Sequence, residues 1–441
     1  MANLFTAQNI LFIPVFLIII SVLVAAHEYG HYLFAKIFKM GVEEFSIGMF
    51  GKKPLWTYGR KDYTIPLLPG QVPNIALPEH VGAAGEVVAL EGKPNKSEVV
   101  ETPEGTILKE STFFTVRPWP VGGFVRIKGM IPEEDGSETK IAGGFYSKPP
   151  WQRLIVLLAG PVFSVIAGVI LIFIVFAFAG EPKADLRPIL GGVMGGSPAE
   201  KAGLRQGDRI VSIAGDPVNT FFDVITHVRN SPNKQIPVVY VRGDKQLTTT
   251  VVPVPDTSET DVLNSEMLPS GKKAIQAKIG TGVGTKYVPI PLGKAAITAI
   301  QAPGKAIVMI GGLLAKPAEL KDNVGGPISM LKETRSAVDQ GLPDVLGLAA
   351  MLSISVGILN LLPIPPLDGG QIVIAFAEMF RRGRRLSMKV QNMAVMAGMC
   401  LVCLLIIFVF TIDLQRIGKS DIPQFSERNH GKAPAEAPSK P

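Results

Sequence analysis

The chain has 441 residues, of which 47% are apolar and only 18% are charged. This composition argues against a purely soluble protein and is typical of a chain that enters a membrane. The net charge of +7 would suit a nucleic-acid-binding protein. The basic residues are instead grouped beside apolar stretches, so a basic nucleic-acid face is the weaker interpretation and we expect no nucleic-acid partner.

Four charge-free stretches predict four transmembrane helices, because about 20 apolar residues are enough to cross a bilayer. They cover residues 10–26, 154–180, 345–367 and 391–412. The first predicts a retained helix rather than a secretory signal, because no basic residue precedes His27 and such signals need a positively charged start. Cys400 and Cys403 lie in the last stretch without polar neighbours, so we expect them to pack rather than to carry metal or redox chemistry.

Basic residues follow the first stretch and separate the third from the fourth. The two groups are Lys36, Lys39, Lys52, Lys53, Arg60 and Lys61, and Arg381, Arg382, Arg384, Arg385 and Lys389. Because cytoplasmic segments near membrane spans are enriched in Lys and Arg, both groups should lie in the cytoplasm. Four spans then place both termini, and the region between the second and third spans, outside the cytoplasm.

The spans divide the chain into segments of different composition. We expect a first transmembrane helix at 1–38, a cytoplasmic β-rich region at 39–150 with an insert at 71–110, a second transmembrane helix at 151–180, a domain at 185–255, a linker with amphipathic or interfacial helices at 256–343, a third transmembrane helix at 344–380, a fourth at 389–412 and a disordered tail at 413–441. Residues 63–70 and 113–129 have strand-like patterns, and residues 256–273 have the composition of a polar linker. Pro303 and several glycines interrupt the stretch 295–314, which favours an interfacial helix over a fifth span.

The domain at 185–255 combines helix and strand signals. Ser197-Pro198 starts a helix that Gly203 ends, and Gly207-Asp208 leads into an alternating strand at 209–213. On these residues, the stretch 192–218 resembles a PDZ domain in the arrangement that bacterial proteases use. PDZ domains bind extended peptides at a sheet edge, so the resemblance implies a possible peptide ligand. A spacer domain without a ligand is the open alternative.

His27-Glu28-Tyr29-Gly30-His31 has the spacing of a zinc-binding helix. Histidines four residues apart lie on one helix face, where both can bind one metal ion with the glutamate beside it as general base. These polar residues are costly to bury in a charge-free span, which indicates a function. Lys36 lies nine residues beyond His27, about 13 Å along a helix, so the motif should lie within the hydrocarbon region. The competing interpretation ends the helix at His27 and turns the motif toward the cytoplasm.

A catalytic zinc ion usually has three protein ligands and a water molecule. The remaining histidines offer no evident third ligand, since His80 falls in the insert, His227 in the PDZ-like domain and His430 in the tail. Among carboxylates, the third apolar stretch leads to Asp368. Three prolines break the helix just before it, and irregular backbone at membrane depth is tolerated only against protein or water. We therefore expect Asp368 to line a cavity as the third ligand; the alternative is a helix cap at the membrane interface.

The motif at 27–31, together with Asn360 and Leu362-Pro363-Ile364-Pro365-Pro366-Leu367-Asp368-Gly369-Gly370, resembles the site-2 protease family. The inserted PDZ-like domain makes the chain similar to the bacterial regulator-of-sigma-E protease branch, and further matching stretches lie at 45–48, 120–125, 159–161 and 325–328. The resemblance implies a polytopic α-helical membrane protein with four transmembrane helices, a membrane-associated cytoplasmic β element and an inserted extracytoplasmic α+β PDZ domain.

The resemblance also implies roles for the site residues. It assigns His27, His31 and Asp368 as zinc ligands, with Zn²⁺ as the cofactor. Glu28 is implied as the catalytic base, and Asn360 as a stabiliser of the substrate backbone or the oxyanion. The strands that end at Gly122-Gly123 resemble the family's membrane-dipping β element, which presents an edge to an unwound substrate.

The activity that the resemblance implies is hydrolysis of a peptide bond within the transmembrane segment of a single-span membrane protein. Anti-sigma factors and signal-peptide remnants are the implied substrates, and membrane lipid surrounds the enzyme. The implied location is the inner (plasma) membrane of a bacterium, with both termini and the PDZ-like domain outside and the active site towards the cytoplasm.

Two features depart from that branch, and two rival functions compete with proteolysis. The insert at 71–110 is longer than expected, and there is one PDZ-like domain where some members have two. The main rival is a non-catalytic membrane scaffold that presents a PDZ domain; a scaffold has no need of a base, such as Glu28, between two imidazoles. The second is a metal-handling membrane protein, which would need further ligands along a path rather than one compact set.

Overall fold

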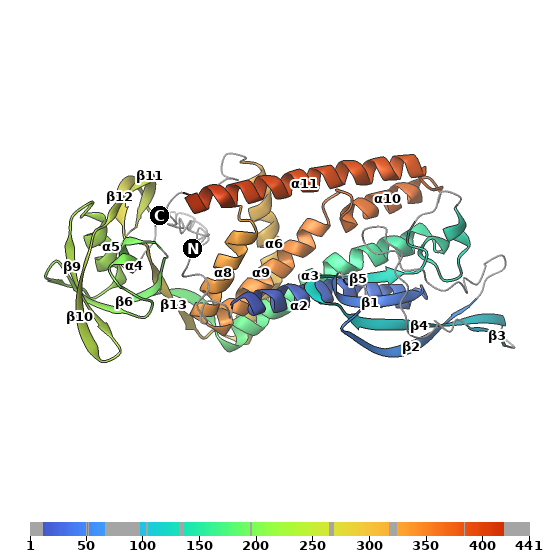
Figure 1. Ribbon diagram of the computed structural model, residues 1–441, viewed down its shortest axis with the longest axis horizontal. Coiled ribbons are helices and arrows are strands. Elements are labelled where there is room, and N and C mark those ends of the chain that lie inside the picture. Colours follow the sequence, from blue (N-terminus) through green and yellow to red (C-terminus); the bar gives the residue numbers. More distant parts are fainter. Residues whose placement is uncertain are drawn as a thin grey trace, which may run out of the picture. The chain divides into compact units, whose positions relative to one another are not determined.

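The computed structural model describes residues 12–49, 51, 53–66, 98–102, 105–131, 136–194, 196–263, 269–316, 324–382 and 384–418. Most of the insert expected at 71–110, and the tail from 419 onward, lie outside these ranges. The chain forms two compact units. The first contains residues 1–178, 291–315 and 330–408, and the second contains residues 179–290, 316–329 and 409–441. Figure 1 labels the elements of both.

Helices make up most of the first unit. They are α2 (Phe12–Ile37), α3 (Pro150–Phe178), α6 (Leu292–Leu314), α8 (Pro327–Gln340), α9 (Leu342–Asn360), α10 (Asp368–Phe380) and α11 (Met388–Gly418), with two short 3-10 turns, η2 (Ser137–Lys140) and η3 (Phe145–Ser147). The first residues of α8 and the last of α11 belong to the second unit. In the described part of the chain, five helices are long and apolar enough to cross a membrane, namely α2, α3, α6, α9 and α11.

Helix α6 covers the stretch 295–314, where an interfacial helix was expected. It continues without interruption through Pro303, so the apolar helices number one more than the four stretches read from the sequence. A proline removes one helical hydrogen bond and does not end a helix whose neighbours hold it in place. Here the buried face of α6, with Ala299 and Ala306, packs in one cluster with Ile172 of α3 and Ile354 of α9.

The third apolar stretch divides into two helices. Helix α9 ends at Asn360 and α10 begins at Asp368, with the proline-rich turn between them. This break agrees with the expectation that prolines interrupt the helix at that point. Helix α9 packs against the first half of α2 through Ala349, which contacts Ile19 and Leu23.

A five-stranded sheet belongs to the same unit. Its strands are β1 (Val42–Met49), β2 (Trp56–Pro66), β3 (Glu98–Thr102), β4 (Gly105–Val116) and β5 (Trp119–Ile127). The order is β2-β4-β1-β5, with β3 beside β4, and β1 runs parallel to β4 and antiparallel to β5. The run expected at 113–129 is thus the end of β4 followed by β5. Among the strands that the structure describes, β5 is at the edge of the sheet, and it packs against α2.

The second unit contains the PDZ-like domain. Its elements are β6 (Glu181–Val193), α4 (Pro198–Lys201), β7 (Arg209–Ile213), β8 (Asp216–Pro217), α5 (Phe221–Arg229), β9 (Ile236–Arg242), β10 (Lys245–Val251) and β13 (Thr281–Val288). The sheet has the order β10-β9-β7-β6-β13, with β8 beside β7. Its core includes Leu190, Ile213, Val224 and Val238, each at most 2% exposed.

The expected polar linker at 256–273 is wrong. These residues belong to a hairpin of β11 (Val254–Leu263) and β12 (Pro269–Lys278), and β13 then pairs with β6 from Glu181 to Val193. The PDZ-like unit therefore extends from Ala179 to Ile290 instead of ending near residue 255. A polar hairpin has the same composition as a polar linker. The hairpin is ordered by pairing between strands, and this pairing leaves no apolar pattern in the sequence.

The start of the expected disordered tail is also ordered. Helix α11 continues to Gly418, and Asp413 is 1% exposed. Its carboxylate accepts hydrogen bonds from the backbone N–H groups of Gly326, Ile328 and Ser329 at 3.1, 3.0 and 3.3 Å. An acidic side chain satisfies the free N–H groups at a helix N-terminus, so Asp413 anchors the start of α8.

Candidate active site and metal centre

Helix α2 carries the His-Glu-x-x-His motif about two-thirds of the way along its length. The apolar run before His27 makes the segment helical, and the four-residue spacing puts both imidazoles on one face. His27 and His31 are each 8% exposed. Their rings meet edge to face with centroids 5.0 Å apart, as expected for two side chains that converge on one point. The motif is thus inside the helix, and the alternative of a helix end at His27 is wrong.

Helix α3 holds each imidazole through its Nδ1 atom. His31 Nδ1 lies 2.8 Å from the Val156 carbonyl oxygen, and His27 Nδ1 lies 2.9 Å from Ser164 Oγ. A carbonyl oxygen only accepts, so His31 donates its Nδ1 proton and the neutral ring keeps a lone pair on Nε2. Such partners fix the orientation of metal-binding histidines. Ser164 and Val156 were not predicted from the sequence, although a lone serine in an apolar span is a signal that could have indicated Ser164.

Close contact between α2 and α3 requires glycine at two positions. A Cβ atom on Gly160 would lie 2.2 Å from His31 Nε2, and one on Gly30 would lie 2.3 Å from the Ala159 carbonyl oxygen. Both distances are far below van der Waals contact, so any side chain would push the helices apart. The spacing of α3 from the motif therefore depends on these two small residues, as in other closely packed membrane helices.

Asp368 meets both histidines from α10, of which it is the first residue. Its Oδ2 atom lies 3.0 Å from His27 Nε2 and 3.4 Å from His31 Nε2, and the two Nε2 atoms are 3.3 Å apart. Ligands about 2.0–2.1 Å from a tetrahedral zinc ion lie about 3.3 Å from one another. The three atoms thus have the spacing of three zinc ligands. The lone pair on His31 Nε2 faces the carboxylate, and the two repel each other unless a cation or a proton lies between them. The residues fit the ion.

This trio is the one group in the described ranges whose His, Cys, Asp or Glu side chains are arranged to hold a metal ion. The structure therefore brings Asp368, the predicted third ligand, next to His27 and His31. His227 belongs to the PDZ-like unit, where its Nδ1 lies 3.9 Å from Asp216 Oδ2. His80 and His430 lie outside the described residues.

Glu28 points toward the edge strand. Its carboxylate accepts a hydrogen bond from the backbone N–H of Val125, and its Cγ lies 3.7 Å from the position of a Cβ on Gly123. Glu28 directly follows His27 in the sequence, and its side chain lies next to β5. A carboxylate in this position lies between the candidate metal site and the edge at which an extended segment could pair.

Asn360 is the last residue of α9, and the proline-rich segment that leads to Asp368 follows it in the sequence. It is half-buried, and its side chain makes no hydrogen bond to another described residue. The structure does not bring it into contact with the two histidines or with Asp368.

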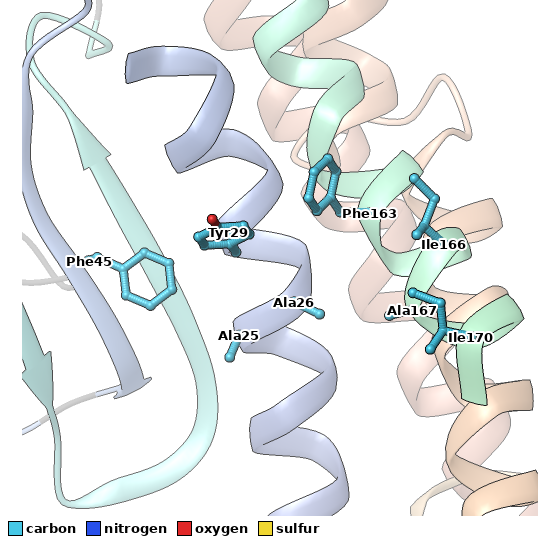
Figure 2. Close-up of a pocket in the computed structure, with 8 residues that line it drawn as sticks. All are labelled: Ala25, Ala26, Tyr29, Phe45, Phe163, Ile166, Ala167 and Ile170. Atoms are coloured by element: carbon cyan, nitrogen blue, oxygen red, sulfur yellow. The ribbon is translucent and has the colours of Figure 1, made fainter. Parts of the chain in front are cut away.

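A shallow apolar pocket of about 440 Å³ is lined by residues of α2 and α3 and by Phe45 of β1, which lies on the strand side of α2 (Figure 2). Its lining is Ala25, Ala26, Tyr29, Phe45, Phe163, Ile166, Ala167 and Ile170. The lining includes none of His27, Glu28, His31 and Asp368, so this pocket is distinct from the candidate metal site.

Comparison with known proteins identifies the family of this site. The model of peptidase family M50 matches residues 15–97 and 104–405. The chain belongs to this family. The M50 peptidase described here is similar to the probable protease eep of Enterococcus faecalis, at 31% identity over 91% of this chain and 98% of that protein. It is also similar to the putative zinc metalloprotease mll0638 of Mesorhizobium japonicum, at 31% identity over 90% and 97% of the two chains.

A third relative is the regulator of sigma-W protease RasP of Bacillus subtilis, at 29% identity over 91% of this chain and 98% of that one. The family is that of the site-2 proteases, so the resemblance read from the motifs is confirmed. This M50 peptidase is a membrane metalloprotease, and members of its family use Zn²⁺. The predictions of a protease and of a zinc cofactor are therefore confirmed as well.

Proposed function

We propose that this M50 peptidase hydrolyses a peptide bond within the transmembrane segment of a single-span membrane protein. The observation that carries the proposal is the triangle of His27 Nε2, His31 Nε2 and Asp368 Oδ2, with sides of 3.0–3.4 Å, beside Glu28 on an apolar helix. Metal ligands and a carboxylate in this arrangement are suited to hydrolysis. Because these residues lie on a helix long enough to cross a membrane, we expect the substrate to be a membrane segment.

His27, His31 and Asp368 would hold the zinc ion, which when bound lowers the pKa of a water molecule and polarises the carbonyl that is attacked. Glu28 takes the proton from the attacking water and delivers it to the leaving amine. The Val125 N–H orients the Glu28 carboxylate for this transfer. Asn360, whose side chain has no hydrogen bond to another described residue, donates its amide to the substrate backbone or to the oxyanion.

The edge of β5 would hold the substrate in an extended form. A helix hides its carbonyl groups in internal hydrogen bonds, so a transmembrane substrate must unwind before it is cut. Among the described strands, β5 pairs with β1 alone, and it lies against Glu28. An unwound segment that adds to this edge gains backbone hydrogen bonds beside the catalytic base. This favours substrates with helix-destabilising residues near the cleaved bond.

The proposed location is the inner membrane of a bacterium, with four spans and with α6 at the membrane interface. The basic groups that follow α2 and α10 support a site toward the cytoplasm, and with four spans both termini and the PDZ-like domain would then lie outside it. Anti-sigma factors and signal-peptide remnants are the proposed substrates. One supporting relative is named as a regulator of sigma-W.

The first test is metal-dependent cleavage of a model single-span protein by the purified enzyme in lipid vesicles. Cleavage should stop when a chelator removes the metal and return when Zn²⁺ is added back, because Asp368 and the two histidines hold the ion that activates water. Cleavage that persists at full rate after the bound zinc has been removed, as measured by elemental analysis, would contradict the proposal.

The PDZ-like domain is proposed to bar substrates that still carry a large ectodomain. Replacing residues 179–290 with a short linker should therefore allow a substrate with a folded ectodomain to be cut, while a trimmed substrate is cut as before. The measurement compares the cleavage rates of the two substrates by the full-length and shortened enzymes. If the untrimmed substrate stays intact with the shortened enzyme that still cuts the trimmed one, the domain is not the barrier.

A further inference from the structure

Two buried ion pairs lie in the first unit, away from the metal site. Arg153 Nη1 lies 2.8 Å from Glu378 Oε2, and their side chains are 5% and 0% exposed. Arg385 pairs with Glu138, whose side chain is also 0% exposed. Charges buried this deeply are costly unless paired, so each pair holds the elements that carry it in one arrangement.

Tyr146 joins the two pairs into one cluster. The Arg153 and Arg385 guanidinium groups lie 5.0 and 4.6 Å from the centre of its ring. Burial raises the pKa of the Tyr146 phenol, and the negative charge of Glu378 raises it further, so the ring stays neutral. The two ion pairs thus meet at one aromatic ring through their arginines, and together they carry no net charge.

The Arg153–Glu378 pair connects the two helices that complete the metal site. Helix α3 carries Arg153 and, three and eleven residues later, Val156 and Ser164, which orient His31 and His27. Helix α10 carries Asp368 at its start and Glu378 ten residues later, which is about 15 Å along the axis. Among the described residues, this is the ion pair that joins α3 to α10. A shift of α10 along α3 would therefore move Asp368 away from the histidines.

We propose that Arg153 and Glu378 are positioning residues that fix α10 against α3, so that Asp368 Oδ2 meets the Nε2 atoms of His27 and His31. The inference rests on the metal site proposed above. It adds a function for two charges that take no part in hydrolysis. The pair acts through the position of Asp368 and contacts neither the metal ligands nor the base.

The test is the affinity and geometry of the metal site after Glu378→Gln, which keeps the size of the side chain and removes its charge. Zinc affinity, measured by chelator competition on the purified full chain, should fall about 10- to 100-fold, as when other groups that support metal ligands are lost. The absorption spectrum of the Co²⁺-loaded protein should also change, because it reports the arrangement of the ligands. In turnover, kcat should fall with little change in KM.

The reciprocal exchange Arg153→Glu with Glu378→Arg restores a pair of opposite charges. It should recover at least part of the zinc affinity and move the Co²⁺ spectrum back toward that of the wild type. Should Glu378→Gln fail to fold, Arg153→Lys takes its place, since it keeps the charge and loses the planar guanidinium. A smaller loss of zinc affinity and an altered Co²⁺ spectrum are then expected.

The matched control is Asp208→Asn. It breaks another ion pair with a buried acid, Asp208 with Arg242 at 2.8 Å, in the PDZ-like unit. This variant should keep wild-type zinc affinity. Wild-type zinc affinity and Co²⁺ spectrum in a folded Glu378→Gln or Arg153→Lys protein would overturn the inference. A wild-type protein that binds no zinc would instead overturn the proposed function.

Discussion

Glu28→Gln should reduce peptide hydrolysis by about 10²- to 10⁴-fold, the contribution of a general base. The amide has the size of the carboxylate and its oxygen can still accept the hydrogen bond from the Val125 N–H, but it cannot take a proton from water. The His27–His31–Asp368 trio is unchanged, so zinc should still bind. The measurement is the cleavage rate of a single-span substrate, with zinc content determined on the same preparation.

The matched control for this substitution is Glu333→Gln on the exposed surface of α8. It removes the same charge away from the site and should leave both cleavage and zinc content unchanged. A Glu28→Gln enzyme that cleaves at the wild-type rate would show that Glu28 is not the base. Loss of zinc from this variant would show that the glutamate belongs to the metal site itself.

Asp368→Asn should weaken both zinc binding and cleavage. The substitution replaces the anionic oxygen that lies 3.0 and 3.4 Å from the two Nε2 atoms with a neutral amide. Loss of a group that only supports a ligand costs about 10- to 100-fold in metal affinity, and loss of a ligand should cost more than about 100-fold. Zinc content after dialysis, followed by the cleavage rate at increasing added zinc, measures both effects.

Asp244→Asn, in the exposed turn between β9 and β10, is the control that removes an aspartate charge without touching the trio. It should bind zinc like the wild type. If Asp368→Asn retained a full equivalent of zinc with unchanged affinity, the third ligand would have to be another group. The pair of substitutions also separates two roles, because Glu28→Gln should keep the metal and Asp368→Asn should lose it.

The His27–His31–Asp368 trio could be predicted from the sequence because each member leaves a local signal. His27 and His31 have helical spacing in an apolar stretch, and Asp368 follows three prolines at the end of another. The structure adds the distances between these side chains, which the sequence does not contain. The three atoms, on two helices, lie 3.0–3.4 Å apart. Elimination of the other histidines was enough to choose Asp368, because few polar groups enter the apolar segments.

The contacts of the supporting residues could not be predicted because they depend on tertiary packing. Ser164 is one serine among apolar neighbours, and only the packing of α3 on α2 puts it 2.9 Å from His27 Nδ1. The Val156 carbonyl has no side-chain signal at all. Arg153 and Glu378 are 225 residues apart, and each alone looks like an ordinary charge at a helix end.

The errors in the predicted fold have the same physical origin. The sequence predicted a linker where β11 and β12 pair, since a polar hairpin and a polar linker have similar composition. It treated Pro303 and the glycines as interruptions of the apolar stretch 295–314, where packing of Ala299 and Ala306 accompanies one continuous helix, α6. Local patterns thus identified the long apolar helices, whereas contacts between distant segments decided the remaining elements.

The central claim is that the cleaved bond lies inside a membrane segment, and mass spectrometry of the products tests it most directly. A single-span substrate, cut in lipid vesicles by the wild-type enzyme, should give product ends within the apolar stretch, in its cytoplasmic half. That position follows from the location of His27, nine residues before Lys36 on α2. Product ends found only in the polar segments that flank the apolar stretch would contradict the account.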